Sequence, residues 1–168
     1  MKVFVEEQRF DQWWFRVLML LVSTIVFGTI AAAYPSLKTD PAAFWTVLTA
    51  AGFSFTIITI LIFFVKLQTK IDELGIHYAF WPLNMKPKLI SWSEITSCKI
   101  KKYYPLKDYG GWGYRTGFLR RKGGAINVKG NIGIQIVFKT GKRLLIGTQN
   151  STNARKALDT YNYKLENS

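Results

Sequence analysis

The chain has 168 residues, of which 49% are hydrophobic, yet it carries a net charge of +13. This length suffices for one ordinary domain with a small appendage. A single histidine and a single cysteine exclude an intrachain disulfide and a metal site of the usual cysteine and histidine kind. Such apolar content is compatible with such a charge only if the apolar residues are segregated along the chain.

The N-terminal segment, residues 1–16, is expected to lie at a membrane surface. Apolar side chains recur at its end with helical spacing, at Phe10, Trp13, Trp14 and Val17. Tryptophans are enriched at the level of lipid headgroups, and a neighbouring arginine can extend its charged end to water. We therefore predict Trp13, Trp14 and Arg16 as membrane-interface anchors.

Two uncharged apolar segments follow, at residues 17–34 and 41–65. As helices they would be roughly 27 and 37 Å long, enough to cross a hydrocarbon core of about 30 Å. Thr39 or Asp40 can cap the second helix, and Pro41 suits its first turn. The sequence therefore predicts a transmembrane helical hairpin over residues 17–66. Small residues such as Gly28 would let its two helices approach closely.

The basic residues around the two segments predict their orientation. Several precede the first segment and many follow the second, whereas the connecting loop holds only Lys38. By the positive-inside rule this multi-pass arrangement places both termini in the cytoplasm. Cleavage as a secretory signal peptide stays open, because Ala31–Ala33 follow an apolar run, although Glu6, Glu7 and Asp11 do not suit a signal peptide's positive region.

Residues 67–168 differ in composition, with 18 Lys or Arg against 6 Asp or Glu. Their pattern is that of short strands, about seven in all, punctuated by glycine pairs. Ile76, Tyr78 and Phe80 alternate on one face of a strand. The final segment changes to helical spacing, and Asn150 or Ser151 can cap a C-terminal helix. The fold class expected is α+β, with a two-helix membrane hairpin followed by an antiparallel β-barrel or sandwich.

This arrangement, with the segment ISWSEI after a strand pair, resembles the bacterial pleckstrin-homology-like (PH-like) domains. The hairpin ahead of it resembles their membrane-anchored members. The resemblance implies a PH-like fold at residues 67–168, with Ile90 and Trp92 facing the core and Ile95 beginning the next element. It implies location in the bacterial inner (cytoplasmic) membrane, and no activity. The loop at Asp72–Gly75, where lipid-binding eukaryotic relatives carry basic residues, is acidic here and disfavours their mode of phosphoinositide recognition.

Residues suited to catalysis are sparse in this domain. His77 alternates with bulky residues in an expected strand, and Cys98 has no identifiable base partner. Among the acids only Asp72 and Glu73 are adjacent, and they fall in a turn. The sequence therefore predicts a protein that is not an enzyme and binds no cofactor or metal, although an uncharacterised enzyme stays as an alternative.

Basic and aromatic residues surround the glycine stretch YGGWGYRTG at residues 109–117. A phosphate-binding loop should lead into a helix, whereas strands are expected on both sides here, so the glycines indicate a tight bend. The candidate residues for contact with lipid or a partner are Lys101, Lys102, Trp112, Tyr114, Arg115, Arg120, Arg121 and Lys122. Solvated strand faces explain the same charges, and single-stranded nucleic acid is disfavoured by the membrane tether.

The function expected is that of a membrane-anchored module for protein interaction or scaffolding at the inner leaflet. The first alternative is a basic surface that reads anionic lipid headgroups. Neither the identity of the protein partner nor the oligomeric state follows from the sequence.

Overall fold

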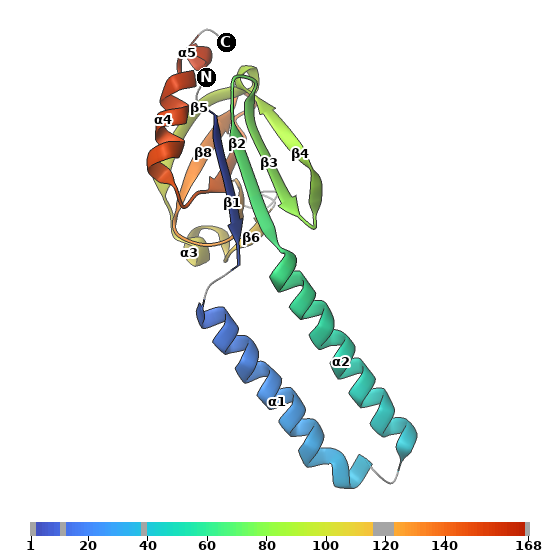
Figure 1. Cartoon of the computed structure of the whole chain (residues 1–168). Coiled ribbons are helices and arrows are strands. Elements are labelled where there is room, and N and C mark those ends of the chain that lie inside the picture. The colour runs from blue at the N-terminus through green and yellow to red at the C-terminus, as the bar shows by residue number, and fades with distance from the viewer. Residues whose placement is uncertain (1–2, 11–12, 38–39, 116–122, 167–168) are drawn as a thin grey trace. The chain divides into compact units, whose positions relative to one another are not determined.

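The computed structural model describes residues 3–10, 13–37, 40–115 and 123–166. The chain divides into two compact units, one formed by Met1–Phe10 with Val65–Ser168 and the other by Asp11–Phe64. The fold is α+β, with two apolar helices in one unit and two β-sheets in the other (Figure 1).

The helical unit consists of α1 (Trp13–Leu37) and α2 (Pro41–Phe64). Asp40 caps α2, because its Oδ1 accepts hydrogen bonds from the backbone N–H groups of Ala42 and Ala43 at 3.0 and 3.1 Å. Both helices are long and apolar enough to cross a membrane, over Arg16–Pro35 and Pro41–Thr59. Their apolar side chains are not buried within the protein.

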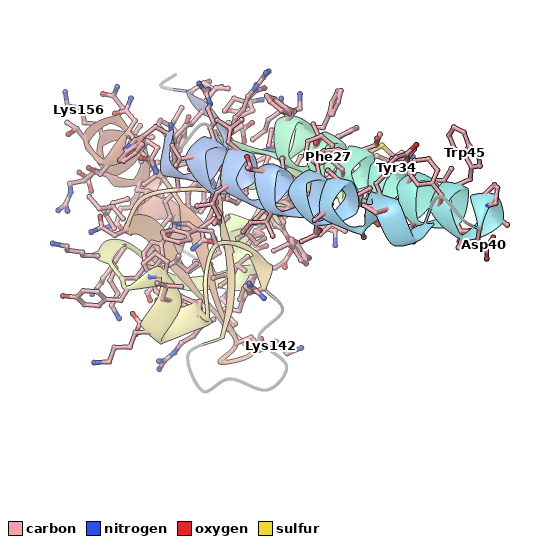
Figure 2. The ribbon with its side chains drawn as sticks, turned by 90° about the horizontal axis from the view of Figure 1, so that it is seen from below. Phe27, Tyr34, Asp40, Trp45, Lys142 and Lys156 are labelled. Carbon is pink, nitrogen blue, oxygen red and sulfur yellow. The ribbon has the colours of Figure 1, made fainter. Side chains whose placement is uncertain are left out.

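Aromatic side chains join the two helices. The rings of Phe27 and Phe55 are 5.8 Å apart, and those of Tyr34 and Phe44 are 5.5 Å apart, both edge to face. Figure 2 shows Tyr34, at the turn end of the pair, beyond Phe27 along α1. Gly28 does not make the contact that its small size suggested, because a Cβ added to it meets no atom within 4 Å.

The first sheet has the order β1-β2-β3-β4 and is antiparallel throughout. Its strands are β1 (Phe4–Arg9), β2 (Lys66–Ile71), β3 (Gly75–Trp81) and β4 (Asn84–Ser91). The sequence does not predict β1, because its pattern favours a single interfacial segment over residues 1–16. Instead β1 pairs with β2 along its whole length, so residues on both sides of the helical unit in the chain share one sheet.

The second sheet has the order β5-β8-β9-β7-β6. After a short 3-10 helix, η1 (Trp92–Glu94), come β5 (Ile95–Lys102), α3 (Pro105–Tyr109), β6 (Gly113–Arg115), β7 (Gly124–Asn127), β8 (Ile132–Phe138) and β9 (Arg143–Gly147). Two expectations need correction. Eight strands, β2 to β9, lie in the C-terminal domain within the described residues, where about seven were expected, β1 adds a ninth, and β7 runs parallel to β9. The two sheets do not close into a barrel in the part of the chain that is described.

The core lies under α4 (Ser151–Tyr161), which is followed by the short α5 (Tyr163–Glu166). Asn150 caps α4 through a hydrogen bond from the Asn153 N–H at 3.2 Å, as the sequence predicted. Trp92 is buried, and its ring stacks on that of Tyr161 at 5.7 Å. Ile90 and Ile95 are buried too, and Ile95 begins β5, as expected.

Candidate interaction surface

The glycine stretch forms a tight bend after α3. Gly110, Gly111 and Gly113 all have positive φ angles, of 72°, 122° and 117°, which other residues rarely adopt. The N–H of Gly110 donates to the Leu106 carbonyl at 2.9 Å and closes the last turn of α3. The bend leads into β6 and not into a helix, so it lacks the helix N-terminus of a phosphate-binding loop.

A buried polar pair fastens this bend to the second sheet. The Asn127 side chain on β7 donates to the Tyr103 hydroxyl at 2.9 Å and accepts from the Gly113 N–H at 2.9 Å. Burial raises the pKa of Tyr103 to about 12, an effect that exceeds the opposing hydrogen bond from Asn127. The Tyr103 ring also meets Tyr109 of α3 edge to face at 5.8 Å. The position of α3 is therefore set by packing and hydrogen bonds.

The three predicted contact residues around the bend have partners within the domain. The Trp112 indole N–H donates to the Gly130 carbonyl at 3.2 Å. Tyr114 packs against the core, with its ring 5.8 Å from that of Phe80. Arg115 is exposed, and one of its terminal nitrogens donates to the Gly110 carbonyl at 3.3 Å. Of the three, Arg115 has the most free surface for an external ligand.

The other predicted contact residues belong to different elements from Arg115. Lys101 and Lys102 are exposed near the end of β5, whereas Arg115 belongs to β6, at the opposite edge of the five-stranded sheet. Arg120, Arg121 and Lys122 lie outside the described residues. On α1, Trp13 and Arg16 are exposed, and the side chain of Trp14 lies outside the described part of the chain.

Sequence reasoning missed an apolar projection between β3 and β4, which we name the β3–β4 tip (Trp81–Lys88). Leu83 and Met85 are 66% and 72% exposed, and Lys86 and Lys88 beside them are exposed too. The segment PLNMKPK contains the signal for it, because apolar residues alternate there with lysines and prolines that do not suit a buried strand. Leu106 on α3 is exposed too.

The opposite end of the first sheet is acidic and internally paired. Asp72 accepts from the Lys70 ammonium at 2.9 Å and lies 3.1 Å from Nε2 of His77. Burial acts to raise the pKa of Asp72, but Lys70, the Leu74 N–H and His77 together outweigh it and lower that pKa to about 2. The Trp92 indole N–H donates to the Asp72 carbonyl at 2.9 Å. His77 and Asp72 thus belong to a paired structural cluster.

The cysteine of β5 is poorly placed for chemistry. Burial raises the pKa of Cys98 to about 12, so its thiol stays protonated at neutral pH. Within the described residues, no three His, Cys, Asp or Glu side chains are grouped so that they could hold a metal ion.

No protein-family model, curated protein or solved structure matches this chain.

Proposed function

We propose that the protein is a membrane-anchored, PH-like interaction module that binds a partner protein at the inner leaflet of a bacterial cytoplasmic membrane. In this proposal α1 and α2 cross the membrane as a hairpin, both termini are cytoplasmic, and the domain acts by binding and not by catalysis.

The observation that carries the proposal is the pairing of β1 with β2. Arg9 and Lys66 are direct partners in this ladder, and α1 and α2 lie between them in the chain. Strands of one sheet occupy one side of a membrane, so the apolar segment between them must cross an even number of times or not at all. Two crossings agree with the basic residues at both ends of the segment.

The exposed Leu106 on α3 supports a surface for a partner protein. Exposed apolar side chains that gather on one surface mark interaction sites. Tyr104, two residues before Leu106, is exposed as well, and Lys107 adjoins Leu106. Its helix is fixed by the Tyr103, Asn127 and Gly113 contacts, so the side chain is held in place before a partner arrives.

Site-specific photo-crosslinking in intact cells tests this proposal. A benzoylphenylalanine replaces Leu106 in the full chain, and Leu74 carries the same probe as the matched control, since it is also an exposed leucine. We expect a discrete protein adduct from position 106 and none from position 74. Equal adducts from both positions, or lipid adducts alone, would contradict a partner-protein surface on α3.

A second candidate function, binding of anionic lipid headgroups, is favoured by the exposure of Lys101 and Lys102. Neither lysine forms an ion pair with a residue of the described ranges. Polybasic segments close to an anionic leaflet gain about 1 kcal/mol per basic residue. Lipid adducts at position 106 that disappear after Lys101→Gln with Lys102→Gln would support this candidate over the first.

A further inference from the structure

The β3–β4 tip lies at the end of the first sheet from which the chain leaves for the helical unit. Lys66 is the Cα partner of Arg9 on one side and of Trp81 on the other. Neighbouring strands are about 4.8 Å apart, so Trp81 lies about 10 Å from Arg9. Only Val65 separates Lys66 from the end of α2 at Phe64. Figure 1 shows the β3–β4 connection at the same end of the sheet as the start of β2.

A bulge interrupts the pairing of β3 and β4 within the tip. Phe80 pairs with Asn84 and Tyr78 pairs with Lys88, so three residues of β4, Met85–Pro87, lie opposite Ala79 alone. These surplus residues have no partner of their own in the β3 ladder, and Met85 among them is exposed. β4 is also the edge of its sheet, so no strand among the described residues covers its outer side.

The two ends of this sheet differ in how their lysines are paired. Lys86 and Lys88 belong to the half that holds the tip, whereas at the other end Lys70 is paired with Asp72. Within the described residues, Lys86 and Lys88 form no ion pair. The nearest carboxylate on β1, Glu7, is already paired with Arg9 at 2.6 Å and Lys66 at 3.7 Å.

We propose that the β3–β4 tip docks on the anionic headgroup layer of the bilayer that holds α1 and α2. Leu83 and Met85 enter the interface, Trp81 lies at the headgroup level, and the two lysines of the tip contact lipid phosphates. Exposed apolar side chains suit the acyl-chain boundary of a bilayer, and the lysines that flank them suit its anionic headgroups. This inference rests on the proposed membrane anchoring. It adds a third attachment beside the two chain connections and so fixes how the domain is tilted on the membrane.

The experiment uses the full chain, without any other membrane protein, in nanodiscs of phosphatidylcholine with phosphatidylglycerol. Cys98→Ala removes the native thiol, and a nitroxide is attached at Leu83→Cys or, separately, Met85→Cys. Leu74→Cys is the matched control, because Leu74 is 59% exposed in the turn at the opposite end of the same sheet. Power saturation compares the collisions of each nitroxide with oxygen, which concentrates in lipid, and with a water-soluble nickel chelate.

We expect the nitroxides at positions 83 and 85 to favour oxygen and the one at position 74 to favour the nickel chelate. Lys86→Gln should lower the equilibrium constant between the docked and undocked tip roughly fivefold, because one lysine near an anionic surface contributes about 1 kcal/mol. Lys142→Gln, in the β8–β9 turn, should leave it unchanged. Pure phosphatidylcholine should weaken the protection at position 83 as the lysine change does.

A water-exposed nitroxide at position 83, equal to that at position 74, would overturn the inference. A nitroxide at Phe27→Cys on α1 separates the two ways to fail. If position 27 is in lipid while position 83 is in water, only the docking of the tip is wrong. If position 27 is also in water, the membrane anchoring fails with it. Protection of position 83 in native membranes but not in nanodiscs would assign the tip to a protein partner and overturn lipid docking.

Discussion

Arg9 and Lys66 are direct partners across β1 and β2, although all of α1 and α2 lies between them in the chain. A β-hairpin normally joins such strands with a few residues. Here the connection is the entire apolar helical unit, which therefore lies between two neighbouring strands of one sheet.

Removal of the apolar unit should leave a folded, soluble domain. We predict that replacing residues 11–64 by Asn-Gly joins Phe10 to Val65 through a two-residue hairpin turn. Both flanking residues pack against the core, so they are retained. Cooperative thermal unfolding and sedimentation as a soluble species would confirm the prediction. A matched chain of residues 67–168 alone should unfold more easily, because it lacks β1 with its buried Phe4 and Gln8.

The same pairing predicts the fate of the N-terminus. Cleavage after Ala33 would remove β1, and with it the hydrogen bonds from Gln8 to the Gly147 carbonyl at 2.7 Å and from Thr148 to Glu6 at 2.6 Å. We therefore expect mass spectrometry of the protein extracted from membranes to find β1 still attached.

The proposed topology predicts which residues are accessible from outside the cell. A membrane-impermeant maleimide should label Ala42→Cys from outside intact cells and Leu74→Cys only after permeabilisation, both in a Cys98→Ala background. Labelling of both before permeabilisation would contradict the topology.

Acid should weaken the domain through Asp72. Its pKa is about 2 when folded, against about 3.9 for an ordinary aspartate, so the unfolded chain takes up the proton first as the pH falls. The stabilisation, at most about 2.6 kcal/mol, is therefore present above the unfolded pKa of about 3.9 and is lost as the pH falls towards about 2. Urea unfolding of the soluble variant across this range measures it. Asp72→Asn should flatten that dependence, whereas Asp159→Asn should keep it.

Cys98 should react slowly while the protein is folded. A pKa of about 12 makes its thiolate about a thousandfold scarcer than that of a thiol with a pKa of about 9. We expect a disulfide reagent at pH 8 to modify it only after denaturation. Leu74→Cys in a Cys98→Ala chain is the control and should react at once. Fast modification of native Cys98 would show that β5 exposes its inner face.

The Tyr103 and Asn127 pair should contribute measurably to stability. Asn127→Ala leaves the Gly113 N–H and the Tyr103 hydroxyl without their partner, at a cost of about 1–3 kcal/mol in the free energy of unfolding. Tyr103→Phe should cost less in the Asn127→Ala background than alone, and a double-mutant cycle measures this coupling. Tyr104→Phe, an exposed neighbour, should change stability by less than about 0.5 kcal/mol. Additive effects would contradict the interaction.

Local patterns predicted much of the fold because they depend on neighbouring residues. The alternation of Ile76, Tyr78 and Phe80 marked β3, and all three are buried. The capping residues Asp40 and Asn150 are likewise visible in sequence. By contrast, β1 has the sequence FVEEQR, whose alternation is obscured by the buried Gln8. Its strand partner is remote in the chain, so no local pattern identifies it.

The interaction surface was harder to predict because it depends on register and on bends. Arg115 was grouped with Lys101 by nearness in sequence, yet the order of the second sheet places their strands at opposite edges. The exposure of Met85 follows from a bulge whose presence only the pairing of β3 and β4 reveals. Charge counts indicate that a surface is basic, but strand order decides which charges are neighbours.

The divided first sheet also bears on how the protein is made. During synthesis β1 emerges before the helices, and its partner β2 follows only after both have left the ribosome. In the hairpin topology that we propose, a chain whose α2 failed to insert would leave β1 and β2 on opposite sides of the bilayer, and the sheet could not form. Completion of the sheet would then depend on correct insertion, and a wrongly threaded chain would expose an unpaired edge that quality-control proteases can recognise.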